Sequence, residues 1–151
     1  MVKRRPVAAL LLGCLLLLAA CTRAAPLATP TLAPTIRASL LVQLPRGEAR
    51  WLRDVAVPKG TDAYELTEVA TKGEVKAKWY PALRSHFVEA VLGVENQAPY
   101  YWLLFLWDEG QKKWEPVPVG ADLLSVKDGH VLAWAYTDTS QDPASPPAAT
   151  P

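Results

Sequence analysis

The sequence predicts an α+β domain over residues 36–138, with a mixed β-sheet covered by one short helix. Several short segments alternate apolar with polar residues, which is the pattern of half-buried strands. One segment early in the domain has apolar residues at helical spacing instead. Stretches rich in proline, alanine and threonine enclose this region on both sides. The enclosed stretch, about a hundred residues, is long enough for a single core.

The domain is expected to open with a β-hairpin. Arg37 to Leu44 and Arg50 to Val57 each place their large apolar residues on one face. Pro45 to Glu48, between them, has the composition of a turn. Pro58, Lys59 and Gly60 then interrupt the pattern, so the second strand ends here.

A short helix is predicted from Asp62 to Thr71. Thr61 or Asp62 is the expected N-cap, with Glu65 three residues beyond Asp62 as in a capping box. Gly73 stands where a C-terminal cap belongs.

Strand patterns continue to the end of the domain. Tyr100 to Trp107 is apolar on both faces, which favours a central strand covered on both sides. Trp114 to Val119 contains two prolines, which suit an edge strand or an extended loop. The other expected strands are Val75–Tyr80, Phe87–Val94 and His130–Thr137. A hairpin, a helix and then further strands is the order of a β-grasp-like fold, in which the helix covers one face of a mixed sheet.

The N-terminus looks like a bacterial lipoprotein signal. Lys3, Arg4 and Arg5 precede an apolar run, Val7 to Leu18, and small residues then lead into Cys21. The resemblance implies cleavage after residue 20 and lipid attachment at Cys21. The alternatives are an ordinary secretory signal or a spanning helix, but the run is shorter than the ~20 residues of a span. We expect a lipid-anchored protein without a transmembrane segment.

Four regions follow from these patterns. Residues 1–20 are the expected signal peptide, and residues 21–35 the acylated cysteine with a Pro/Ala/Thr linker. Residues 36–138 form the folded domain, and residues 139–151 are expected to be a disordered tail.

Charge and cysteine content limit the kinds of partner and of chemistry that can be expected of this protein. Without the signal peptide the chain carries 13 basic and 15 acidic residues, with no basic block, so nucleic acid is not an expected partner. Cys14 leaves with the signal and Cys21 is the expected acylation site. The folded domain therefore has neither a disulfide nor a reactive thiol.

Several short motifs occur in order along the domain. They are Val57–Thr61, Val88–Val94, Tyr101-Trp102, Val119-Gly120-Ala121, Val126–Gly129 and Trp134-Ala135-Tyr136. In this order they resemble the transcobalamin-like C-terminal domain family, over nearly the whole domain. The resemblance implies a β-grasp-like fold and a corrinoid such as cobalamin as the candidate ligand. Animal cobalamin carriers bind it between this small domain and a large helical domain, and no helical domain is predicted in this sequence.

No enzymatic activity is expected. The sequence lacks the His-Glu-x-x-His, Gly-x-Ser-x-Gly and Gly-rich phosphate motifs. His86 is expected to be a surface histidine and His130 a turn residue, with axial ligation of a corrinoid cobalt as their alternative use. The acidic residues of predicted turns lack the spacing of a calcium loop. These residues are Asp108, Glu109, Asp122 and Asp128. We therefore expect no metal site and no required cofactor.

Aromatic residues are the candidate binding set. Trp102 and Trp107 should point to opposite faces of their strand. Trp79, Tyr80 and Trp114 are expected to be exposed, because lysines or prolines flank them. The candidate ligand-binding residues are Tyr100, Trp102, Trp107, Trp114 and Trp134. The alternative is that these side chains simply fill the core.

Together, the patterns predict a non-catalytic lipoprotein at the cell membrane or outer surface, with a small ligand-binding domain. Corrinoid capture is the sharpest form of this prediction. The alternative is a structural or protein-interaction module of the cell envelope, which would dock through a sheet edge or an aromatic patch. Glycan binding through exposed tryptophans is a third option. An aromatic cleft near Tyr100–Trp107 would favour the hypothesis of a corrinoid-binding domain. An edge strand at Trp114 without a concavity would favour the hypothesis of a protein-interaction module.

Overall fold

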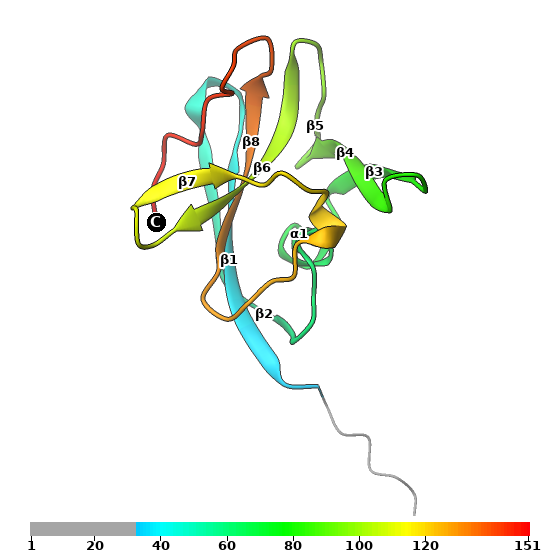
Figure 1. Cartoon of the computed structure of the whole chain (residues 1–151), viewed down its shortest axis with the longest axis vertical. Helices are drawn as coiled ribbons and strands as arrows, with labels where there is room; N and C mark the ends of the chain where they lie inside the picture. Colours follow the sequence, from blue (N-terminus) through cyan, green and yellow to red (C-terminus); the bar gives the residue numbers. More distant parts are fainter. Residues whose placement is uncertain (1–32) are drawn as a thin grey trace, which may run out of the picture. The chain divides into compact units, whose positions relative to one another are not determined.

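The computed structural model describes residues 33–151 (Figure 1). The predicted signal peptide, Cys21 and the linker up to residue 32 lie outside the described residues. Within the described part, no helix has the length and apolar character needed to cross a membrane.

The main sheet has five strands in the order β2-β1-β8-β6-β7. Their bounds are β1 Thr35–Gln43, β2 Ala49–Pro58, β6 Tyr100–Asp108, β7 Lys113–Pro116 and β8 Val131–Asp138. The predicted hairpin is confirmed, because β1 and β2 pair antiparallel across the short turn η2 (Pro45–Gly47). β1 pairs in parallel with β8, and β8 pairs antiparallel with β6. The sheet is therefore mixed, and its first and last strands lie side by side.

The predicted helix is present as α1 (Ala63–Ala70). Asp62 is its N-cap and forms a capping box with Glu65, as the sequence predicts. After the helix the chain reverses at Gly73, whose φ of +82° suits a residue without a side chain. Thr67 donates a hydrogen bond to the Ala63 carbonyl, and its hydroxyl also accepts one from the indole of Trp134 on β8.

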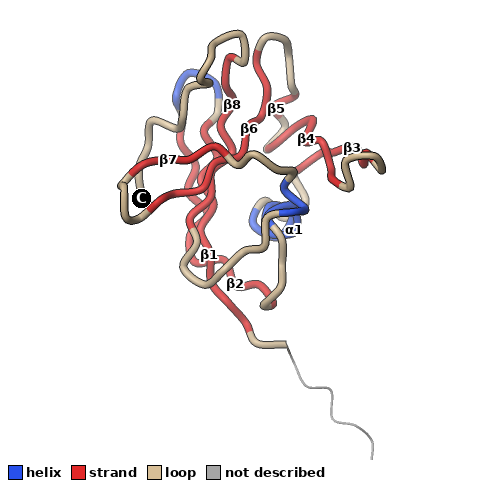
Figure 2. Tube along the Cα trace, in the orientation of Figure 1, coloured by secondary structure: helices blue, strands red, loops and turns tan. Residues whose placement is uncertain are grey.

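The three strands that come directly after α1 form a second, separate sheet rather than extending the first. β3 (Val75–Tyr80), β4 (Ser85–Val91) and β5 (Val94–Glu95) pair antiparallel in this order. The predicted strand Val75–Tyr80 is present, but the predicted strand Phe87–Val94 is not continuous, because the chain turns at Leu92 and Gly93, which both have positive φ, between β4 and β5. The division into two sheets is not predicted either, because partner choice is not encoded in the alternation of one strand. Within residues 33–151 the arrangement is still α+β, with one α-helix among the strands. Figure 2 shows where α1 and the strands lie along the chain.

The two faces of the five-stranded sheet have different partners. One face packs against α1 and the second sheet, and Trp102, Leu104 and Trp134 belong to this core. The other face carries Leu41, Phe105 and Trp107. Trp102 and Trp107 thus point to opposite sides, which confirms the prediction from the pleat of the strand.

One expectation about the C-terminal part differs from the structure. Proline neighbours predict an exposed Trp114. In the structure the tail crosses the sheet face that carries Trp107 and covers Trp114, which is only 7% exposed. The Trp114 indole donates a 2.8 Å hydrogen bond to the carbonyl of Ala149.

Candidate functional site

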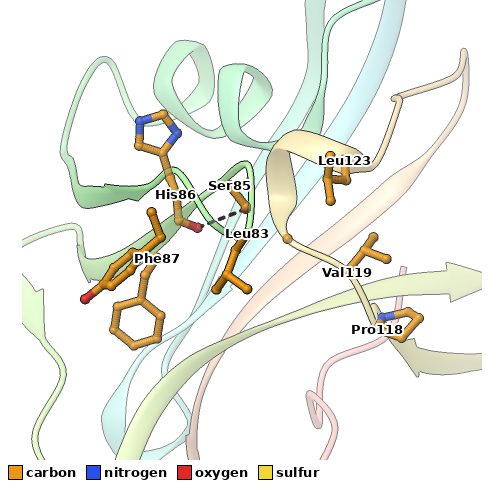
Figure 3. A pocket seen from close by; sticks show the side chains of 9 residues that line it. Leu83, Ser85, His86, Phe87, Pro118, Val119 and Leu123 are labelled. Atoms are coloured by element: carbon orange, nitrogen blue, oxygen red, sulfur yellow. Dashed lines mark hydrogen bonds between the residues drawn. The ribbon is translucent and has the colours of Figure 1, made fainter.

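A hollow of about 430 Å³ opens between the β3–β4 hairpin and the segment that follows β7. Residues 80–87 line one side and residues 118–123 the other (Figure 3). We call it the β4 hollow. Its size lies at the lower end of the range of small-molecule sites.

The rim of the β4 hollow is apolar and exposed. Of the eight large apolar residues that are exposed in residues 33–151, five line this one hollow. They are Tyr80, Leu83, Phe87, Val119 and Leu123. Leu83, in the turn between β3 and β4, is 68% exposed. An exposed apolar cluster around a concavity is typical of a binding surface rather than of scattered surface residues.

The two sides of the hollow are held together by a tight contact at its base. Gly120 packs on Ser85 so closely that a Cβ at Gly120 would overlap the Ser85 side chain. The segment that contains Gly120 is also fixed to α1, because Leu124 and Val126 exchange backbone hydrogen bonds with the chain around the N-cap. The hollow is therefore preformed on two anchored elements.

Asp122, in the short turn η3 (Ala121–Leu123), joins these elements with its carboxylate. It accepts hydrogen bonds from the Ser85 hydroxyl at 2.9 Å, from the His86 backbone N–H at 2.7 Å and from the His86 ring at 2.6 Å. Burial alone would raise the pKa of Asp122, but these hydrogen bonds outweigh it and hold the pKa below its ordinary value. The carboxylate is therefore ionised near neutral pH.

His86 is half-buried and more constrained than the surface histidine expected from sequence. The His86 ring stacks on the Tyr64 ring, with centroids 4.1 Å apart. The Trp79 ring is tilted against the His86 ring, with its centroid 5.0 Å from that of His86. Because Asp122 is an acceptor, the contact assigns the proton of the neutral ring to Nδ1 and leaves a lone pair on Nε2. Among the described residues, none hydrogen-bonds to Nε2. Figure 3 shows this ring on the opposite side of β4 from Phe87, so it does not point into the apolar rim.

The predicted aromatic site residues are not brought together. Trp102 and Trp134 are buried on the α1 side, where their indoles donate to Val94 O and Thr67 Oγ1. Trp107 and Trp114 form an edge-to-face pair on the other face. Tyr100 is exposed and stacks on Tyr136. The aromatics thus divide between two cores and one surface stack.

The rim residues of the β4 hollow are not among the site residues predicted from the sequence. Trp79 and Tyr80 are exposed as predicted, but Leu83, Val119 and Leu123 received no role. The sequence does contain a sign of this role. These large apolar residues lie in segments predicted as turns, which offer no strand or helix face on which to bury them. Such residues are candidates for a binding surface.

The other titratable residues that the sequence singles out lie outside the β4 hollow. His130 lies in a turn as predicted, and burial, followed by the charge of Lys127, lowers its pKa. No group of three or more potential metal ligands occurs within residues 33–151.

Comparisons with known proteins bear on the fold. No protein-family model matches the chain, and no curated protein matches it either. Among solved structures, the chain is similar to haptocorrin, which was crystallised in complex with Cbi. The TM-score is 0.58 at 17% identity, over 73% of this chain and 27% of the haptocorrin chain.

The likeness shows that the described domain shares the fold of one part of haptocorrin. The chain spans about a quarter of the haptocorrin chain, so the match does not concern the rest of that protein.

Proposed function

We propose that this protein is a non-catalytic, lipid-anchored lipoprotein that binds a corrinoid, such as cobinamide or cobalamin, at the β4 hollow. The observation that carries the proposal is the gathering of exposed apolar residues around one preformed concavity. The fold likeness to haptocorrin with its ligand Cbi, and the sequence resemblance to the transcobalamin-like family, support a corrinoid as the ligand class.

The hollow is open on one side, so it contacts one face of a ligand as large as a corrinoid. Tyr80, Leu83 and Phe87 supply apolar area on one side, and Val119 and Leu123 supply it on the other. Burial of such side chains contributes about 1.5 to 3 kcal/mol each when complete. A few partly buried contacts of this kind support micromolar affinity.

The first test is a calorimetric titration of the full chain, in detergent, with cobinamide and with cobalamin. We expect saturable binding to the unaltered protein. Leu83→Ser should bind roughly tenfold more weakly, because the ligand no longer buries the leucine side chain, and this costs about 1.4 kcal/mol of binding free energy. Val69→Ser is the matched control, since Val69 is also exposed but lies on α1 outside the β4 hollow. Absence of saturable binding, or equal effects of the two substitutions, would contradict the proposal.

A second candidate function is docking of another envelope protein on the same apolar rim. The exposure of Leu83 favours it, because exposed apolar clusters also mark protein interfaces. Photo-cross-linking in cells from position 83, with position 69 as the control, tests this function. A specific cross-linked protein without corrinoid binding would favour the second candidate over the first.

The anchoring is tested separately from ligand binding. Cys21→Ser should abolish metabolic labelling with a fatty-acid analogue and release the protein from the membrane fraction. Labelling that persists in this variant would contradict acylation at Cys21.

A further inference from the structure

A second hollow, of about 620 Å³, lies beside the start of β6 and the end of β8. It is lined by Pro45 of η2, by residues 93–97, and by Tyr100 and Tyr136. We call it the tyrosine hollow. It shares no lining residue with the β4 hollow, so the proposed corrinoid site leaves it without a role.

Two tyrosine rings form an aromatic surface in the tyrosine hollow. Tyr136 pairs with Trp102 across the strands, so Tyr100, two residues before Trp102, lies on the same face of the sheet. The rings of Tyr100 and Tyr136 stack with centroids 5.7 Å apart and planes 19° from parallel. Tyr100 is 44% exposed, and among the described residues Tyr136 is the one ring that packs on it. One face of the Tyr100 ring is therefore available to a ligand.

Polar side chains border this aromatic surface. Glu95 and Gln97 both line the tyrosine hollow, and both are exposed. The Lys76 ammonium donates a 2.9 Å hydrogen bond to Glu95 and thereby lowers the pKa of that carboxyl. The Glu95 carboxylate is thus an ionised acceptor near neutral pH. Gln97 adds an amide, which has both donors and an acceptor.

The segment between β5 and β6 is held in place by hydrogen bonds. The Asn96 amide donates to Val88 O at 2.8 Å and accepts from the Trp102 backbone N–H at 2.9 Å. Gln97 and Tyr100 exchange backbone hydrogen bonds in both directions. The Tyr136 hydroxyl donates a 3.0 Å hydrogen bond to the carbonyl of Glu95, which fixes the second ring. The rings and the polar groups are therefore arranged before a ligand binds, and this lowers the entropic cost of binding.

This combination of groups suits a carbohydrate. A pyranose ring with equatorial substituents has C–H groups on its two faces and hydroxyls around its edge. Its faces pack on an aromatic ring, and its hydroxyls need donors and acceptors beside that ring. Tyr100 supplies the ring face, and Glu95 and Gln97 supply the acceptors and donors. The exposed aliphatic side chains Leu83, Val119 and Leu123 give the β4 hollow a different character.

We propose that the tyrosine hollow binds β-linked oligosaccharides of glucose or N-acetylglucosamine, with one sugar ring stacked on Tyr100 and its hydroxyls hydrogen-bonded to Glu95 and Gln97. The ring substituents of these sugars are equatorial, so the C–H faces are flat enough to lie against an aromatic ring. This inference does not depend on corrinoid binding, because the two hollows have no residue in common.

The test is a calorimetric titration of the full chain with cellohexaose and with chitohexaose. The detergent must lack a sugar headgroup, because an alkyl glycoside would compete for the same site. We expect saturable binding of at least one oligosaccharide, with a dissociation constant of about 1 mM or tighter, as a few exposed contacts support. Sorbitol, which has hydroxyls but no ring, should not bind.

Matched variants assign the binding to the tyrosine hollow. Tyr100→Ala should weaken it about tenfold, because the stacking surface is lost. Tyr100→Phe keeps the ring and should keep the affinity. Tyr80→Ala is the control, since Tyr80 is also an exposed tyrosine but lines the β4 hollow, and it should leave oligosaccharide binding unchanged. Gln97→Ala should weaken binding several-fold through loss of hydrogen bonds.

Three results would overturn the proposal. The first is the absence of saturable binding of both oligosaccharides. The second is an equal loss of affinity in Tyr100→Ala and Tyr80→Ala, and the third is a loss in Tyr100→Phe as large as in Tyr100→Ala. If Tyr100→Ala does not fold, the exposed Gln97→Ala variant decides, and an unchanged affinity in that variant would contradict the site.

Discussion

Thr67→Val tests the buried hydrogen bond that the structure places between α1 and the main sheet. Thr67 is fully buried, and its hydroxyl accepts the Trp134 indole N–H at 2.8 Å. Valine keeps the shape and the β-branching of threonine but removes the acceptor. The Trp134 donor, itself 95% buried, is then left without a partner.

The expected cost comes mainly from that orphaned donor. A buried donor without a partner costs about 1 to 3 kcal/mol. Thr71→Val is the matched control, because the Thr71 hydroxyl is also buried and only donates, to Thr67 O. That carbonyl keeps the hydrogen bond from the Thr71 backbone N–H, so no buried donor is orphaned. We expect Thr67→Val to cost about 1 to 2 kcal/mol more than Thr71→Val.

The assay is urea unfolding followed by tryptophan fluorescence, with thermal unfolding as a second measure. The difference between the two variants corresponds to about 4 to 8 °C in Tm for a unit of this size. In a Trp134→Phe background no indole donor remains, so Thr67→Val should cost no more than Thr71→Val. Equal free energies of unfolding for the two valine variants in the unaltered background would refute the reasoning.

The remaining predictions concern the base of the β4 hollow and the helix cap. The hydrogen bonds from His86 and Ser85 lower the pKa of Asp122, so its stabilising contribution is complete above its ordinary pKa of 3.8 and is lost as the pH falls through the lowered value. Asp122→Asn should therefore flatten the dependence of Tm on pH below about pH 4; an unchanged slope would contradict this role. Gly120→Ala should destabilise the fold by about 1 to 3 kcal/mol in urea unfolding, because the new Cβ overlaps Ser85. Since φ at Gly120 is −62°, this substitution tests the overlap alone, and a neutral result would argue against the close contact. Asp62→Ala should cost about 1 kcal/mol in the same assay, through loss of the N-cap, whereas no loss would show that the capping box is not formed in solution.

Local elements of this fold are readable from sequence because their determinants are local. The hairpin before residue 58 follows from alternation around a turn, and the helix follows from apolar spacing with Asp62 and Glu65 as its capping box. The opposite orientation of Trp102 and Trp107 follows from the pleat alone. Each of these features depends on residues only a few positions apart.

The candidate site could not be derived in the same way. The hollow forms because Gly120 packs on Ser85, two residues that no periodic pattern links. The aromatic residues that composition singled out are mostly committed to cores, since Trp134 packs on α1 and Trp114 lies under the tail. Burial of a side chain depends on which element covers it, and that is a tertiary property.

The sequence by itself determined most of the strand segments, the helix with its cap and the α+β class. These follow from backbone geometry and from the two periods at which side chains repeat along a strand or a helix. Only the tertiary structure decided the parallel pairing of β1 with β8, the division into two sheets and the gathering of apolar turn residues around one hollow. Such outcomes depend on contacts between distant segments, where packing and backbone pairing choose among partners with the same local pattern.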